Sequence, residues 1–246
     1  MIGQTVRHSI FGEGVVSAVN GSSMTVVFGV GEKRFIYPEA FREHLAFEDG
    51  AEQRRIDRLF ARIERTQKES LAAAEEERKR LNRVKTYKIH PSSQAAFNAE
   101  APVSDWSVST GRYLSGMSAG EIRIPERLAP NSACLLTRVP PRGGEAGRQI
   151  VGAFMVEEDF FGDECRDGVI NAHPDYRIEL AEREFLPFWS YFPEKLRPRW
   201  GSVPFKFFPN LLMQHILIDM TDAADGERAE EIKAFFNYFS RVNELR

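Results

Sequence analysis

The chain has 246 residues, of which 42% are hydrophobic and 28% are charged, so it holds enough apolar material for one large domain or two smaller ones. The net charge of −3 excludes a positive field over the whole surface that would recruit nucleic acid. Two cysteines form no disulfide or zinc framework, and no apolar run approaches the length of a bilayer span, so we expect a protein of the reducing cytoplasm with no membrane partner.

Short strand patterns fill the first fifty residues and predict a small β-barrel. They cover residues 5–8, 14–19, 24–28 and 33–37. Asn20-Gly21 is a strong signal for a tight hairpin, because both central residues of such a turn need positive φ. A short helical turn at 38–41 is expected to end the sheet.

The segment from Val6 to Val16, with Val-Arg-His followed by Phe-Gly-Glu-Gly-Val-Val, resembles the opening of Tudor-like, SH3-type barrels. Such barrels occur in some bacterial repair helicases and in transcription-associated proteins. The resemblance implies a protein-docking module over 1–48, and we expect its docking patch around Phe11 and Phe35. His8 is interpreted as a turn or edge-strand residue, since no Asp or Cys is spaced to activate it.

A long charged helix is predicted over 50–86. No Gly or Pro interrupts residues 51–84, which are rich in the helix formers Ala, Glu, Arg, Lys and Leu. One apolar face is formed at helical spacing by Ile56, Leu59, Phe60 and Ile63. The stripe then thins, and the charged run 75–80 is interpreted as a solvent-exposed spacer with intrahelical ion pairs.

The remaining residues, 87–246, predict a mixed α+β domain. Strand patterns are found at 87–89, 106–111, 134–139, 149–156 and 176–180, and a turn is expected at 130–132 before the third of them. Residues 94–97 are interpreted as a helical turn. Two amphipathic helices at 211–220 and 227–245 close the chain and are expected to pack on the sheet.

Trp106, the loop Thr110-Gly111-Arg112 and the strand Ile-Val-Gly-Ala-Phe-Met-Val at 150–156 resemble the EVE/ASCH-type branch of the PUA-like superfamily, over 106–192. The resemblance implies a mixed β-barrel with flanking helices that binds RNA, or a modified base flipped out of duplex DNA. The chain departs from a minimal domain in the long insertion after Arg112 and in its large aromatic C-terminal part. The whole chain also resembles bacterial proteins that pair such a barrel, helix and C-terminal domain.

Segment 185–208 interleaves aromatic and cationic side chains. From Glu194 to Lys206 four cations oppose one carboxylate, a net charge of +3. A flipped base needs flat aromatic faces, and its backbone needs nearby cations. We therefore expect Trp189, Arg199 and Trp200 to line one accessible pocket. The full set of candidate base- or backbone-binding residues is Trp106, Arg112, Trp189, Tyr191, Arg199 and Trp200. The alternative is that these aromatics form a core for the closing helices.

Three functions are open. The first is a non-enzymatic reader of DNA or RNA, tethered to the protein-docking barrel. The second is an adaptor that docks on transcription or repair proteins. The third is a metal-dependent hydrolase, which requires Glu157, Glu158 and Asp159 to converge within metal-ligand distance. No phosphate loop, dinucleotide fingerprint or zinc spacing is present, so we expect no cofactor, and we prefer the first function.

Overall fold

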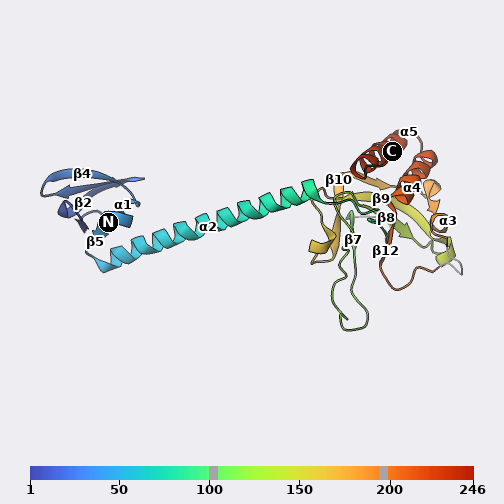
Figure 1. The fold of residues 1–246 in the computed structure, drawn as a ribbon, viewed down its shortest axis with the longest axis horizontal. Coiled ribbons are helices and arrows are strands. Elements are labelled where there is room, and N and C mark those ends of the chain that lie inside the picture. The colour runs from blue at the N-terminus through green and yellow to red at the C-terminus, as the bar shows by residue number, and fades with distance from the viewer. Residues whose placement is uncertain (100–104, 194–198) are drawn as a thin grey trace. The chain divides into compact units, whose positions relative to one another are not determined.

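The computed structural model describes residues 1–99, 105–193 and 199–246. The chain divides into two compact units, Met1–Lys79 and Arg80–Arg246 (Figure 1). Helix α2, Gly50–Thr86, contributes residues to both units, and it matches the helix predicted from composition. No described helix is both long and apolar enough to cross a membrane.

The N-terminal unit is an antiparallel sheet with the strand order β4-β3-β2-β1-β5. The elements are β1 (Thr5–His8), β2 (Gly12–Asn20), β3 (Ser23–Phe28), β4 (Gly31–Ile36), α1 (Ala40–Glu43) and β5 (Leu45–Phe47). A tight hairpin is present, but its turn is shifted by one residue from the prediction. Asn20 pairs with Ser23, the central residues are Gly21 and Ser22, and of Asn20 and Gly21 only the glycine has positive φ, at 60°. Strand β5 was not predicted, because three residues are too few to show a period.

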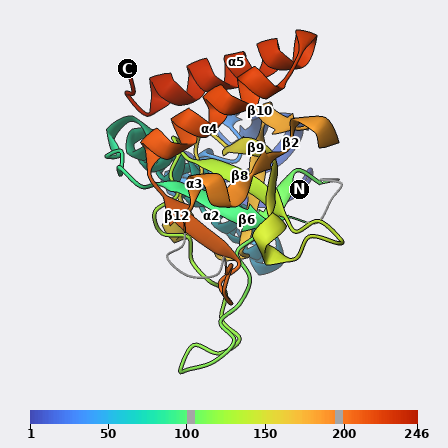
Figure 2. The same ribbon diagram turned by 90° about the vertical axis from the view of Figure 1, so that its right-hand side faces the viewer.

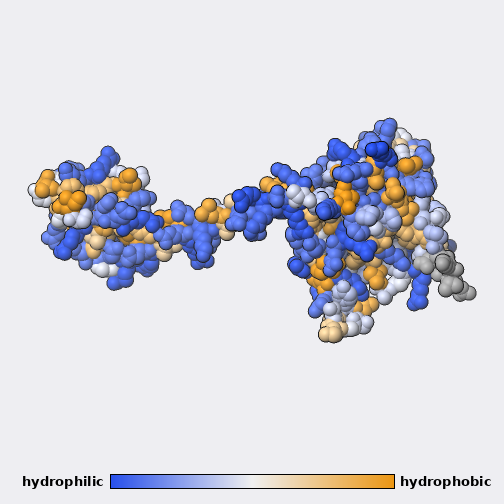
Figure 3. Space-filling model, in the orientation of Figure 1, coloured by the Kyte–Doolittle hydropathy of each residue, from blue (hydrophilic) through white to orange (hydrophobic). Residues whose placement is uncertain are grey.

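Alternating residues of β2 and β3 point into the core of this unit. Val16, Met24, Val26 and Phe28 are all buried there. Gly14 is required by packing, because a Cβ at this position would come 2.5 Å from the ring of Phe28. Hydrophobic residues also gather at the surface of the N-terminal unit (Figure 3).

The C-terminal unit is built on a second, curled sheet with the order β12-β6-β8-β9-β10-β7 and with β11 paired to β9. The strands are β6 (Gln94–Asn98), β7 (Ser107–Ser109), β8 (Ala133–Arg138), β9 (Gln149–Val156), β10 (Val169–Glu179), β11 (Leu186–Pro187) and β12 (Phe205–Phe208). The β6–β8 pair is parallel and the others are antiparallel. The end of β7 approaches the start of β12, since a Cβ on Gly111 would lie 2.6 Å from Cγ of Pro204.

Consecutive residues of β8 enter two different hydrophobic clusters. Ala133 and Leu135 pack with the two closing helices, α4 (Asn210–Ala223) and α5 (Gly226–Val242), which lie together over one face of the sheet (Figure 2). Cys134 and Leu136 pack on the opposite face. Burial on both faces explains why this strand reads as a continuous apolar run. The shorter helices are η1 (Glu145–Gly147), η2 (Gly162–Glu164), η3 (Glu182–Glu184) and α3 (Phe188–Tyr191).

Two predicted elements are wrong. Residues 87–89 form no strand, and the backbone N–H of Tyr87 still donates to the carbonyl of Arg83, which continues the helical hydrogen bonding of α2 by one residue. Residues 94–97 are strand β6 and not a helical turn, since pairing with β8 and β12 overrides their local preference. Residues 122–124 contribute only an isolated bridge, between Ile122 and Arg112.

Candidate nucleic-acid interface

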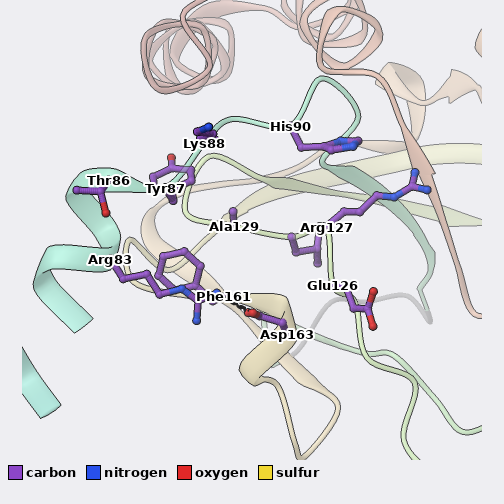
Figure 4. Close-up of a pocket in the computed structure, with 11 residues that line it drawn as sticks. Arg83, Thr86, Tyr87, Lys88, His90, Glu126, Arg127, Ala129, Phe161 and Asp163 are labelled. Atoms are coloured by element: carbon purple, nitrogen blue, oxygen red, sulfur yellow. Dashed lines mark hydrogen bonds and ion pairs between the residues drawn. The ribbon is translucent and has the colours of Figure 1, made fainter. Parts of the chain in front are cut away.

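A groove of about 480 Å³ lies where the last turn of α2 meets two loops of the C-terminal unit (Figure 4). We call it the α2 groove. The side chains that matter for its chemistry are Arg83, Tyr87, Lys88, His90, Arg127 and Phe161. The first four follow one another along the end of α2 and the segment leading to β6, Arg127 lies in the loop before β8, and Phe161 precedes η2.

Two loops form the floor of the groove by packing closely at Gly162. The backbone N–H of Gly162 donates to the carbonyl of Leu128 at 2.8 Å, and that of Leu128 donates to Pro125 at 2.9 Å. A Cβ on Gly162 would overlap the carbonyl oxygen of Pro125. Glycine is therefore needed here to bring Phe161 and Arg127 to the same groove.

Arg83 lies across the ring of Phe161, with its guanidinium carbon 3.8 Å from the ring centroid (Figure 4). One of its nitrogens donates to both carboxylate oxygens of Asp163 at 2.7 Å, and the other pairs with Glu164. Partial burial lowers the pKa of Arg83, but the two carboxylates more than offset this and the net pKa is raised. The guanidinium is thus held in one orientation, with its charge balanced by close partners.

Two other cations line the groove together with the carboxylate of Glu126. Lys88 and Arg127 are exposed, and neither makes an ion pair with any described residue. Arg127 instead lies 5.0 Å from the ring centroid of Phe207. The Nδ1 atom of His90 accepts a hydrogen bond from the backbone N–H of Ser92 at 3.0 Å, so the neutral ring keeps its proton on Nε2 as a donor.

Buried side-chain amides hold the loop that carries His90. The amide network consists of Ser93, Gln94, Asn131, Asn210 and Asn243, all buried. Asn210 at the start of α4 donates to the carbonyl of His90 at 2.9 Å and to the side-chain oxygen of Asn243 at 3.0 Å. The network therefore couples the α2 groove to both closing helices.

The aromatic residues expected to bind a base have internal partners. The indole N–H of Trp189 donates to the carbonyl of Glu145 at 2.6 Å, and the hydroxyl of Tyr191 donates to Asp219 at 2.5 Å. Trp200 is 9% exposed and lies in the core beside Phe188, with Arg148 4.1 Å from its ring centroid, which leaves little indole for a base to stack on.

The structure links Trp189 and Trp200 through Phe188, which contacts both rings. Arg199 is exposed, whereas Lys195 and Arg197 lie outside the described residues. The core alternative is confirmed for Phe188 and Phe208, which are buried in the cluster of the closing helices, whereas Phe205 is buried on the opposite face of the sheet. A base-binding role for Trp189, Tyr191, Arg199 and Trp200 stays a prediction.

Trp106 and Arg112 flank β7. Trp106 is half-buried, and its carbonyl accepts a hydrogen bond from Ala172 at 2.9 Å, while Arg177 lies 5.3 Å from its ring centroid. Arg112 is exposed, but one of its nitrogens donates to the carbonyl of Gly120 at 2.6 Å. Both side chains thus contact their own sheet edge or loop, and their predicted roles remain untested.

Phe11 and Phe35 do lie together on the N-terminal unit. Their ring centroids are 4.5 Å and 5.4 Å from that of His8. The Nδ1 atom of His8 accepts backbone hydrogen bonds from Ile10 at 3.0 Å and from Phe11 at 3.3 Å. His8 itself is the last residue of β1 and pairs with both Gly12 and Leu45, so its interpretation as a turn or edge-strand residue is wrong. Docking at this patch stays a prediction.

Of the three carboxylates of the hydrolase hypothesis, Glu157 and Asp159 line the same surface pocket. Asp159 pairs with Arg80, and Glu158 lies 3.7 Å from His173. In the part of the chain that the structure describes, no group of three or more His, Cys, Asp or Glu could hold a metal ion. The convergence expected of Glu157, Glu158 and Asp159 is thus not found there.

Sequence reasoning missed the α2 groove. Tyr87 and Lys88 looked like part of a strand, and Phe161 and Arg127 are far from them in sequence. The one local signal was the spacing of Arg83 and Tyr87, four residues apart at a helix end. Comparison with protein-family models, curated proteins and solved structures finds no match to this chain.

Proposed function

We propose that the chain is a non-enzymatic nucleic-acid reader of the cytoplasm, which binds DNA or RNA at the α2 groove of its C-terminal unit. In this proposal the unit is a PUA-like domain over 87–246, and the N-terminal unit is a Tudor-like, SH3-type barrel over 1–48. The observation that carries the proposal is the groove itself, where the exposed Lys88 and Arg127 stand beside the stacked pair Arg83–Phe161.

The chemistry of the groove suits a nucleic acid better than a generic anion. A phosphate is bound most readily by a cation that is not already paired with a carboxylate of the protein. Lys88 and Arg127 are such cations, since neither makes an ion pair with a described residue. Bases are bound on flat π surfaces, which here are Tyr87 and the guanidinium of Arg83. Since the whole chain is net negative, binding has to come from this local arrangement.

The test is the salt dependence of binding. The full chain is titrated into fluorescent single- and double-stranded DNA and RNA at about 50 and about 200 mM salt, with methylcytosine versions included. The double variant Lys88→Gln/Arg127→Gln loses two phosphate contacts. The slope of log K against log salt is negative, and on single strands it should become less steep by about 1.4. Arg58→Gln/Lys68→Gln, which removes two exposed cations from the N-terminal half of α2, is the matched control. Equal binding by the two double variants would contradict the proposal.

A second function is favoured by the meeting of Phe11 and Phe35 around His8. Both side chains are half-buried, and Lys33 lies 5.5 Å from the ring centroid of Phe11. We propose this patch as the surface that docks on a transcription or repair protein. Retention of purified RNA polymerase by the immobilised chain, with and without Phe35→Ala, is the measurement, and equal retention would count against it.

A further inference from the structure

We infer that Arg83 is the stacking platform for an unpaired nucleobase in the α2 groove, an inference that rests on the proposed function. The ring of Phe161 is itself only 6% exposed, and the guanidinium of Arg83 lies over it at 3.8 Å. The side chain of Arg83 is 36% exposed and lines the groove. The flat surface that the groove offers at this point is therefore the guanidinium plane, with the phenyl ring as its support (Figure 4).

The hydrogen-bonding edge of Arg83 is already occupied. Asp163 accepts two hydrogen bonds of 2.7 Å from one terminal nitrogen, and Glu164 pairs with the other. A phosphate would have to displace two carboxylates to reach these donors. One face of the guanidinium lies on Phe161, so a base would stack on the opposite face, as bases do on guanidinium planes in single-stranded complexes. Arg83 is thus arranged to hold a base and not to anchor a phosphate.

The rim of the groove supplies the rest of a nucleotide site. Lys88 and Arg127 are exposed cations, and the Nε2–H of His90 is left as a donor by the bond that Nδ1 accepts. A groove of about 480 Å³ falls in the size range of small-ligand sites, roughly 300–1,000 Å³. A base inside a duplex is stacked on both faces, so this site selects single strands or a base turned out of the helix.

An abasic oligonucleotide separates stacking from phosphate contacts, because it keeps the backbone charge and removes every base. We expect the full wild-type chain to bind a short single strand more tightly than its abasic counterpart and its duplex. Arg83→Lys keeps the positive charge and removes the plane. It should weaken binding of the single strand by roughly five- to one-hundredfold, the equivalent of one lost base stack, and leave abasic binding unchanged.

Arg80→Lys is the matched control, since Arg80 lies on the same helix, pairs with Asp159 and does not line the groove. Equal effects of the two variants, or equal wild-type binding of abasic and normal strands, would overturn the platform role while leaving the proposed function in place. Failure of the wild-type chain to bind any oligonucleotide would instead overturn the proposed function. The abasic comparison needs no variant, so equal binding of the two strands would overturn the platform role even if Arg83→Lys folds poorly.

Discussion

Truncation of Asn243 in the amide network should destabilise the C-terminal unit strongly. Its side-chain oxygen accepts hydrogen bonds from Asn131 at 2.7 Å and from Asn210 at 3.0 Å. Its side-chain nitrogen donates to the carbonyls of Asn131 at 2.8 Å and Phe239 at 3.0 Å. Asn243 is 4% exposed, so water does not readily replace these bonds after Asn243→Ala.

The size of the destabilisation depends on whether each partner atom of Asn243 keeps another hydrogen bond. Four bonds of 3.0 Å or less are lost, and at about 0.5–1.5 kcal/mol each they sum to about 2–6 kcal/mol. Three of the four partner atoms retain another bond, to Ser93, to His90 and from the backbone N–H of Asn243. The carbonyl of Asn131 is left without a described partner. We therefore expect a loss of about 2–4 kcal/mol in the free energy of unfolding.

Tryptophan fluorescence during urea unfolding is the assay. All three tryptophans, Trp106, Trp189 and Trp200, belong to the C-terminal unit, so the signal reports on that unit alone. Asn237→Ala removes an exposed asparagine from the same helix and should change stability by less than about 0.5 kcal/mol. The reasoning is refuted if Asn243→Ala lies within about 1 kcal/mol of that control, since each lost bond would then be nearly neutral.

Two further predictions concern other parts of the chain. Gly162→Ala should lower the free energy of unfolding by an overpacking cost of about 1–3 kcal/mol, followed by tryptophan fluorescence in urea, because its Cβ would overlap the carbonyl oxygen of Pro125. Gly147→Ala is the control in the same unit, since its Cβ would meet Pro140 at an ordinary 3.4 Å, and equal urea midpoints of the two variants would argue against the close contact at Gly162. Burial and the nearby His44 lower the pKa of His8. Below its ordinary pKa of 6.5, the unfolded chain therefore binds a proton at this residue that the folded unit does not bind. The free energy of unfolding should fall as the pH drops from 6.5 towards the lowered pKa. His8→Asn should flatten this loss, measured by circular dichroism, and an unchanged pH profile would exclude His8 as its source.

The elements that the sequence predicted correctly are those whose pattern lies within one short stretch of the chain. Helix α2 follows from its composition, and β8 and β9 follow from apolar runs, at 133–136 and at 150–156. Strand β6 was missed because Gln94 and its neighbours favour no strand until β8 and β12 pair with them. The α2 groove was missed for the same reason, since Arg83 and Phe161 meet only through tertiary structure.

The position of β6 between β8 and β12 also sets the order in which the sheet can assemble. β8 and β9 are close in sequence and close a short loop, whereas the parallel β6–β8 contact has to close the chain from Asn98 to Ala133. The β6–β12 contact has to wait for Phe205, late in synthesis. Closing a long loop costs chain entropy before the distant strands can pair. We therefore expect the hairpins around β9 to form first and β6 to pair afterwards. During translation one edge of β6 therefore stays open until β12 has left the ribosome.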